Sequence, residues 1–589
     1  MFLGKQGLAF RGHREDGEYF DDPNNNPGNF KALLKLLESL GNEDISYLLR
    51  TAPRNSTYTS KTICEQIIDV IGEAVTDKLL GDVKKADFFS ILADEALDIS
   101  KKEQMALVLR FVDINQKIRE EFIKFMHCDS GLSGESLANL ILTEIEKLGL
   151  SMTKCRGQGY DGAGAMSGCN KGVSSRITAL YPLALFIHCF SHRLNLSTMM
   201  MITVKPVRDM FDNVRVISDF FNNSAKRYER FQETIQKCLP KTESVNKLLD
   251  ICRTRWLERI EGLSRFKDAF SATYIALKSI STNELSHECP WNADSRATAT
   301  GLSLLMKKFE FIFCVVVCNE IMQYLYSLTV SLQSSTLAIV EAYQFVLTVI
   351  ETLEGIKKNI EEHHLRWYNE AVRVAKQLDV EPSVKRTCFS QYFRPNTPYS
   401  NVSEYYRRNI TLPMLNEIIE DLRRRFSPES QQFIHGFYCI PQIMQKYPKA
   451  WKEKLLTFMK TYRNDLPHYE SCRAEVDCWG TFWLEEFKGE EPETLQDLLN
   501  FTKVDMYPNI STVLKLLGTV PVTTCTCERC MSVLRRLKTY LRSTIGQDRF
   551  NDLAVLHIHY GLEIDPNDIL DRLILKYPKR IKMTNILAD

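Results

Sequence analysis

The sequence predicts an α/β protein in which a mixed β-sheet precedes a long all-helical stretch. Two observations predict this. Between residues 88 and 188, short apolar or alternating runs of strand length are separated by segments with helical spacing. After about residue 195, apolar residues three or four positions apart dominate. A helix with Glu528 at its head follows near the C-terminus, and its arginines and leucines fall on different sides.

The first half of the sheet block is expected to be a three-stranded meander. Apolar runs of strand length recur three times after a helical N-terminal part, with only short polar breaks between them. The expected elements are helices from Phe30 to Leu40 and over about 58–80, and strands over 88–93, 105–113 and 121–126.

The second half of the block alternates helices and strands. Its glycine-containing run after Cys155 ends on Asp161-Gly162, a loop-forming pair, and Pro182 stops the helix that follows. The expected elements are a helix over 133–147, a strand over 155–160, a helix over 168–180 and a strand over 183–188.

The helical stretch has two predicted loop-like breaks, over 286–292 and about 381–413. Its predicted helical segments are 205–235, 258–282, 300–360 and 365–379. We therefore expect an N-terminal helical region (1–84), the first part of the α/β core (85–257), an α-helical insertion (258–504), a completing segment (505–565) and a tail (566–589).

Composition narrows the classes of function. The chain has 589 residues, 44% of them hydrophobic and 25% charged, which is enough apolar material for large cores. Its 75 basic and 74 acidic side chains give no bulk attraction to DNA or to anionic lipid, so DNA binding requires local basic faces. Seventeen cysteines without regular spacing indicate reduced thiols, as in the cytosol or nucleus. The longest apolar run, 311–318, is too short to cross a membrane, and we expect a buried helix there.

Three isolated acids stand at element ends. Asp94 follows the first strand, Asp161 follows the fourth, and Glu528 begins the late helix. Three carboxylates gathered by folding can hold two Mg²⁺ or Mn²⁺ ions for phosphodiester chemistry. Each acid also has an ordinary interpretation, because an aspartate after a strand often forms a turn and a glutamate at a helix start favours the helix dipole.

Five motifs in fixed order carry a family resemblance. They are Asp94–Ser100, Gly159–Gly168, His188–Leu196, Thr254–Trp256 and the Glu528 helix. Together they resemble the transposases of the hobo–Activator–Tam3 (hAT) superfamily, and more closely the zinc finger MYM-type and THAP-type transposon-derived proteins of vertebrates. The resemblance extends from the Phe10–His13 region to about Ile558.

The resemblance implies a ribonuclease-H-like mixed-sheet core interrupted by a large all-α insertion, with a C-terminal helical dimerisation segment. It implies that Asp94, Asp161 and Glu528 are the catalytic and metal-binding triad. It also implies a role at displaced DNA bases for Arg255 and Trp256, since an indole stacks on a base while a guanidinium binds phosphate. The alternative is that Trp256 is a core aromatic residue and Arg255 a surface charge.

The final helix has a positive face that either contacts DNA phosphates or is simply solvated. Its basic residues are Arg529, Arg535, Arg536 and Lys538. Family resemblance places a dimerisation region over about 505–562, whose apolar contacts would come from Leu534, Leu537, Leu541, Leu553 and Leu556.

Cysteine-containing motifs near these residues do not predict zinc. Cys189 and His192 form a Cys-x-x-His pair, but a structural zinc site needs four ligands, so we expect packing and hydrogen bonding beside the catalytic pocket. Cys525, Cys527 and Cys530 are expected to be small core residues.

The motifs also depart from the family pattern. Leu97 and Ala165 replace polar residues beside two of the acids, Cys530-Met531 replaces Ser-Phe, and no zinc finger precedes the Phe10 motif. We therefore predict a nuclear, DNA-binding protein derived from a transposase, domesticated or decaying, that forms homo-oligomers or dimers with related hAT-like proteins and has no membrane partner. The alternative is an active Mg²⁺-dependent transposase performing phosphodiester hydrolysis and strand transfer.

Overall fold

The computed structural model describes residues 1–11, 28–51, 59–238, 256–283, 290–384, 399–427, 431–487, 489–539 and 542–578. Its contacts divide the chain into two units. Unit 1 comprises Met1–Cys189 and Gln432–Asp589, and unit 2 is the continuous segment Phe190–Gln431 between them. This grouping differs from the predicted segments, because the helices after Phe190 pack within unit 2 and those after Gln432 pack within unit 1.

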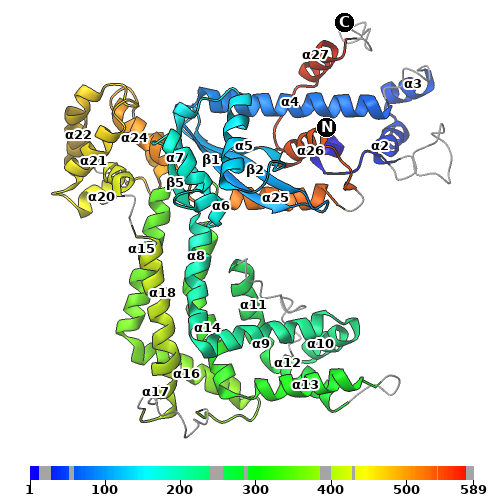
Figure 1. The fold of residues 1–589 in the computed structure, drawn as a ribbon, viewed down its shortest axis with the longest axis vertical. Coiled ribbons are helices and arrows are strands. Elements are labelled where there is room, and N and C mark those ends of the chain that lie inside the picture. The colour runs from blue at the N-terminus through cyan, green and yellow to red at the C-terminus, as the bar shows by residue number, and fades with distance from the viewer. Residues whose placement is uncertain are drawn as a thin grey trace. The chain divides into compact units, whose positions relative to one another are not determined.

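One mixed, five-stranded sheet forms the centre of unit 1 (Figure 1). The strand order is β3-β2-β1-β4-β5; β1 pairs antiparallel with β2, and β2 with β3, whereas β1, β4 and β5 run parallel. The predicted α/β class with a mixed sheet is thus confirmed, in a mostly helical chain, while the predicted large insertion stays a prediction. The strands are β1 (Phe89–Leu97), β2 (Glu103–Val112), β3 (Ile118–His127), β4 (Cys155–Tyr160) and β5 (Leu185–His188).

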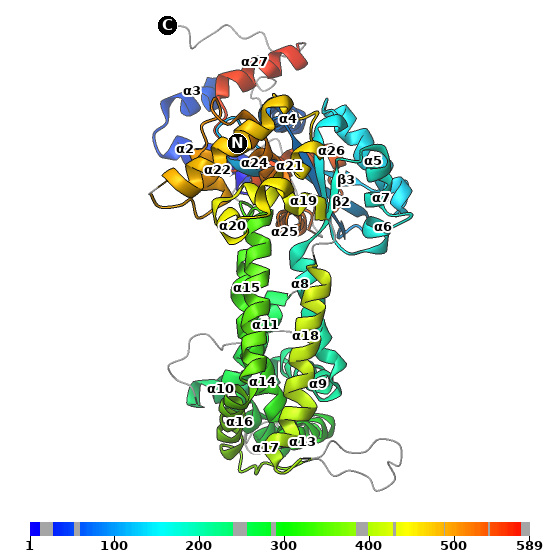
Figure 2. The same ribbon diagram turned by 90° about the vertical axis from the view of Figure 1, so that its left-hand side faces the viewer.

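Helices cover both faces of this sheet. β2 is buried along nearly its whole length, which explains its almost continuous apolar sequence. Figures 1 and 2 show α5 and α7 on one side of the sheet and α25 on the other. The helices before and within the sheet region are α1 (Phe2–Lys5), α2 (Gly28–Ser39), α3 (Glu43–Thr51), α4 (Lys61–Lys85), α5 (Gly134–Lys147), α6 (Gly164–Ser167) and α7 (Val173–Leu180).

The C-terminal part of unit 1 returns to the sheet. Helix α25 contacts β1, β2 and β3, and α26 packs against α4 and β3. These helices are α19 (Gln431–Ile434), α20 (Pro441–Lys446), α21 (Trp451–Thr461), α22 (Cys472–Thr481), α23 (Leu495–Phe501), α24 (Pro508–Thr519), α25 (Cys525–Leu537), α26 (Gln547–Ile558) and α27 (Pro566–Lys576).

Unit 2 contains helices and no strand in its described residues. They are α8 (Phe190–Met199), α9 (Lys205–Asn222), α10 (Ala225–Cys238), α11 (Trp256–Asp268), α12 (Phe270–Ser281), α13 (Ala293–Met306), α14 (Phe309–Ser331), α15 (Ile339–Lys358), α16 (Ile360–Lys376), α17 (Val402–Tyr406) and α18 (Leu412–Arg425), with a π-helical turn over Arg407–Thr411.

The predicted break over 381–413 is wrong at its C-terminal end, because α17 and the π-helical turn lie there. Pro413 is the second residue of α18, directly after the π-helical turn, and having no N–H it donates no hydrogen bond to that turn. Tyr406 is buried, with its ring 4.7 Å from that of Phe313. Residues 385–398 of the predicted break lie outside the described chain.

The apolar run 311–318 is part of a buried helix, as predicted. The whole helix, α14, is longer than the run and is the one described helix with the length and composition to cross a membrane. Its most apolar window is 72% buried inside the protein, which is typical of a core helix.

Candidate active site

The register of two parallel strands brings the first two predicted acids together. In the β1–β4 pairing, Leu92 lies opposite Gly159. Two residues further along each chain, Asp94 and Asp161 therefore stand side by side near the same end of the sheet. The prediction that Asp94 follows the first strand is wrong, because β1 continues to Leu97 and pairs Asp94 with Ala106 of β2. Neighbouring strands lie about 4.8 Å apart, so the two side chains share one region. Asp161 lies just beyond β4, where the Ala163 N–H donates to its Oδ1 at 3.0 Å and orients the carboxylate.

Glu528 reaches this region because the chain before α25 crosses β4. Side chains on Gly157 and Gly159 would collide with Pro521, at 2.6 and 3.0 Å, so these strand glycines allow the segment to lie directly on the strand. The Thr524 N–H then donates to Cys189 Sγ at 3.2 Å, just beyond β5. Glu528 lies in the first turn of α25, which packs on β1, β2 and β3.

Asp94 interacts electrostatically with each of the other two carboxylates. The pKa of Asp94 is raised to about 7, first by burial and then by the negative charges of Glu528 and Asp161. The structure thus brings the three predicted acids close enough to influence one another, although they come from distant parts of the chain.

Sequence reasoning missed a fourth acid, Glu95. Burial raises its pKa, and the charges of Asp161 and Glu103 add to the effect. Its Oε2 atom is buried, and no hydrogen-bond partner for it is found among the described groups. Strand alternation points Glu95 to the face opposite Asp94. Its position directly after Asp94 was the available sequence signal.

The donor chemistry fits a hard cation, since carboxylate oxygens are what Mg²⁺ and Mn²⁺ prefer. Asp94, Asp161 and Glu528 are the residues that could hold it. Within the described residues, however, no three His, Cys, Asp or Glu side chains are arranged as a ready metal site.

The raised pKa of Asp94 gives a pH-dependent stability. An unfolded aspartate ionises near pH 3.9, whereas folded Asp94 stays protonated up to about pH 7. The folded state therefore binds the extra proton between these values, and the free energy of unfolding falls as pH rises from about 4 to about 7. In metal-free buffer, we expect Asp94→Asn to be more stable than wild type by at least about 1 kcal/mol at pH 8, with little difference at pH 4. Urea unfolding at both pH values measures this.

Asp129→Asn is the matched control, because Asp129 is exposed. It should change the urea midpoint little at either pH. An equal gain for Asp94→Asn at pH 4 and pH 8 would contradict the ionisation argument.

The basic face of α25 is partly as predicted. Arg529, Arg535 and Arg536 are exposed, and so are Glu528 and Ser532. Lys538 does not belong to this face. Its Nζ lies 2.6 Å from Asp98 Oδ2, and its side chain is only 3% exposed, so it is not available to a phosphate.

The predicted dimerisation leucines lie in the protein's own core. Leu534, Leu537, Leu553 and Leu556 are all at most 5% exposed and belong to the hydrophobic cluster that includes the sheet. They cannot form a partner surface without unfolding this core. The amphipathic pattern was correct, but its apolar side faces the chain's own sheet. Leu541 lies outside the described residues.

Of the remaining predicted residues, two lie at an undescribed segment, Cys189 is the last residue of the first part of unit 1, and His192 lies in unit 2. Arg255 and the side chain of Trp256 lie outside the described part, although Trp256 begins α11. His192 lies on α8 of unit 2 and is partly exposed. Cys189 is buried and has the predicted hydrogen-bonding role through Thr524.

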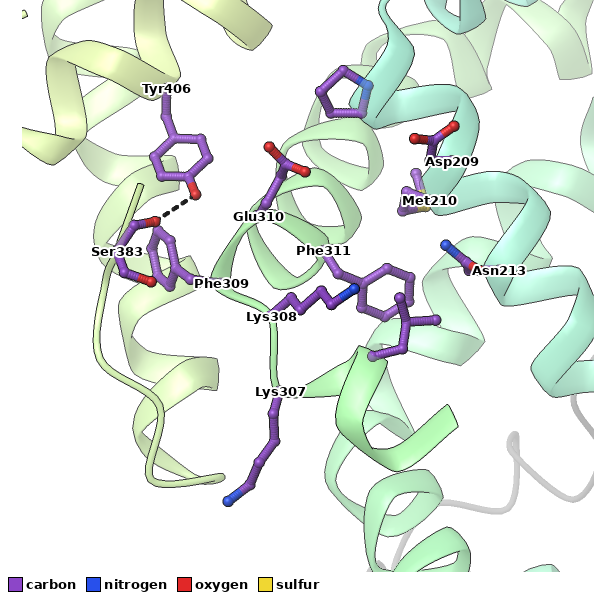
Figure 3. Close-up of a pocket in the computed structure, with 12 residues that line it drawn as sticks. Asp209, Met210, Asn213, Lys307, Lys308, Phe309, Glu310, Phe311, Ser383 and Tyr406 are labelled. Carbon is purple, nitrogen blue, oxygen red and sulfur yellow. Dashed lines mark hydrogen bonds between the residues drawn. The ribbon is translucent and has the colours of Figure 1, made fainter. Parts of the chain in front are cut away.

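A well-formed pocket of about 420 Å³ lies within unit 2 (Figure 3). Asp209 and Asn213 of α9 and Lys308 and Glu310 at the start of α14 line it, and the Tyr406 hydroxyl donates to the Ser383 carbonyl at 2.8 Å. It contains none of the residues predicted from the sequence. Its mixture of opposite charges indicates no particular ligand.

Comparison with known proteins supports the resemblance to hAT transposase-derived proteins that the sequence motifs indicate. Residues 1–172 match the ZMYM1/FAM200, RNase-like domain, and residues 475–562 match the hAT family C-terminal dimerisation region. The chain is 28% identical to the human protein named 52 kDa repressor of the inhibitor of the protein kinase, over 99% of this chain and 76% of that protein. It is also 28% identical to the mouse protein of that name, over 100% of this chain and 77% of that protein.

Proposed function

We propose that this chain, which belongs to the hAT transposase-derived proteins, binds DNA as a dimer in the nucleus. The family regions support derivation from a transposase and the capacity to dimerise. The relatives are named as repressors, which favours a regulatory role for the bound DNA complex. The single observation that carries the proposal is the exposed side of α25.

This side carries Glu528 at its start and a basic stripe after it. Exposed residues recur at 528, 529, 532, 535 and 536, a spacing that keeps them on one side of a helix. At 1.5 Å per residue, the stripe is about 12 Å long. Arginines at this spacing can bind successive phosphates bidentately, while leaving Glu528 at the head of the stripe.

Two substitutions near the acids favour binding over catalysis. Leu97 ends β1 and is 54% exposed, so a large apolar side chain lies where the family resemblance leads us to expect a polar one. Ala165 lies in the short helix α6, just after Asp161, and offers no side-chain hydrogen bond. Both changes remove polar groups that could support ligands or substrate near the carboxylates.

The DNA-binding proposal predicts an effect of the stripe on affinity. We expect Arg535→Gln/Arg536→Gln to weaken binding to a 30-base-pair duplex about tenfold at 100 mM salt. The slope of log affinity against log salt should fall by about 1.8, because two phosphate contacts are lost. Fluorescence anisotropy over a salt series measures both quantities.

Lys446→Gln/Lys449→Gln is the matched control, since it removes the same charge from exposed positions of unit 1 away from α25. An equal loss of affinity in both double variants would mean that only net charge matters. Unchanged binding in the arginine variant would remove the stripe from the interface.

A second candidate function is cleavage and strand transfer of DNA with Mg²⁺ or Mn²⁺. The observation that favours it is the alignment of Asp94 with Asp161 together with the electrostatic interaction of Asp94 with Glu528. Bound ions would supply activation of the attacking oxygen and stabilisation of the leaving oxygen. The chain's own contribution is to hold the three carboxylates at one end of the sheet. Metal-dependent nicking by wild type that is lost in Asp161→Asn tests this candidate.

A further inference from the structure

A buried ion pair lies beneath the start of α25. Arg110 of β2 and Glu120 of β3 are directly opposite in the strand register, and Arg110 Nη1 lies 2.6 Å from Glu120 Oε1. Their side chains are 0% and 2% exposed. A buried pair of this kind gains little over well-packed apolar residues, because both charges lose their hydration. Its presence therefore calls for a role beyond stability.

The pair contacts both helices that lead to Glu528. Arg110 Nε donates to the Gly518 carbonyl at 2.9 Å, in the last turn of α24. A Cβ at Gly518 would lie 2.9 Å from the Val112 side chain, so a larger residue here would force this part of α24 or the strand to shift. On the other side, the Thr526 hydroxyl donates to Glu120 Oε2, at the second residue of α25.

These contacts define a clamp. Arg110, Glu120 and Thr526 tie the end of α24 and the start of α25 to strands β2 and β3. Glu528 lies two residues after Thr526, within the same helical turn. Asp94 belongs to β1, which pairs directly with β2. The clamp thus joins the element that bears Glu528 to the sheet that bears Asp94.

We propose that Arg110, Glu120 and Thr526 are positioning residues that fix the Glu528 carboxylate relative to Asp94 and Asp161. The inference rests on the proposed use of these three carboxylates as one cation site. Thr526 is the discriminating member, because its loss breaks the link to the helix and leaves the Arg110–Glu120 pair intact.

The test compares Thr526→Val with Thr526→Ser, which retains the hydroxyl. Thr519→Val is the matched control, since that hydroxyl donates only within α24, to the Lys515 carbonyl at 2.7 Å. Two readouts are measured on the full chain: Mn²⁺ affinity by titration calorimetry, and hydrogen exchange of the amides in the first turn of α25. We expect Thr526→Val to weaken Mn²⁺ binding about tenfold and to speed exchange in that turn, as outer-shell changes at metal sites do. Thr526→Ser and Thr519→Val should match wild type in both.

The outcomes separate this inference from the proposed site. Faster exchange with unchanged Mn²⁺ affinity would overturn the positioning role and leave a purely structural anchor. Unchanged exchange would overturn the clamp itself, whatever the metal result. If wild type binds no Mn²⁺, the cation site is refuted; the positioning role falls with it, and exchange still decides whether the clamp anchors α25.

Discussion

Asp161→Asn is expected to lower Mn²⁺-dependent nicking of a DNA duplex by at least about 100-fold, if the chain cleaves DNA. Removing one negative charge from a shared cation site removes a ligand for which Asn is a poor substitute. A 100-fold loss corresponds to about 2.7 kcal/mol of transition-state stabilisation, a modest share of what bound metal ions contribute. Nicking of a supercoiled plasmid, followed over a Mn²⁺ series, measures the effect.

The substitution should leave the fold intact, because the hydrogen bond that orients the Asp161 side chain can still form. Asp161 Oδ1 accepts a hydrogen bond from the Ala163 N–H, and the side-chain oxygen of Asn can accept the same bond. The local turn is therefore retained. Asp129→Asn, at an exposed position, should cleave like wild type. Equal cleavage by Asp161→Asn and wild type would show that the activity does not use this carboxylate.

If the wild-type chain nicks DNA in neither Mg²⁺ nor Mn²⁺, the enzymatic candidate is refuted. The DNA-binding candidate is not affected. Binding through the arginine stripe requires no metal ion, so the anisotropy measurement still decides that proposal. Each of the two candidate functions can therefore be refuted without refuting the other.

Local patterns predicted the sheet well. Each strand has a sequence signal of its own, either a buried apolar run as in β2 or a loop pair at its end as after β4. The acids were found for a related reason, because Asp161 stands where β4 ends and Asp94 follows the apolar run of β1, although the strand itself continues to Leu97. Their alignment depends on the parallel pairing of β1 with β4, which strand order alone did not specify.

Long-range burial could not be read from the sequence. The helical spacing of Leu534 and Leu537 predicts one apolar side, but it does not tell whether that side faces the chain's own sheet or a partner. The sequence also does not reveal which charged residues pair in the folded chain, as Lys538 illustrates. Its partner Asp98 is 440 residues away in sequence, and nothing near either residue predicts the pair.

Lys538→Met is expected to destabilise unit 1 by about 3–5 kcal/mol at pH 7.5, because it leaves Asp98 buried without its cation. Burial alone would raise the pKa of Asp98, but hydrogen bonds from Lys538, Lys102 and Ser100 hold the pKa below its usual value. In wild type, the stability from ionised Asp98 is therefore present above about pH 4 and is lost only as pH falls through the lowered folded pKa. Without Lys538, the buried carboxyl ionises less readily, so the destabilisation should shrink as pH falls to 4.5.

Two further variants isolate the charge pair. Asp98→Asn combined with Lys538→Met removes both charges and keeps the oxygen that accepts from the Ser100 and Lys102 N–H groups at 2.7 and 3.0 Å. This double variant should recover much of the loss at pH 7.5, because no buried charge is left unpaired. Lys515→Met is the control: its partner Asp87 is 52% exposed, so its loss should cost less than about 1 kcal/mol. If Lys538→Met and Lys515→Met shifted the urea midpoint equally, burial would not be what makes the Lys538–Asp98 pair important.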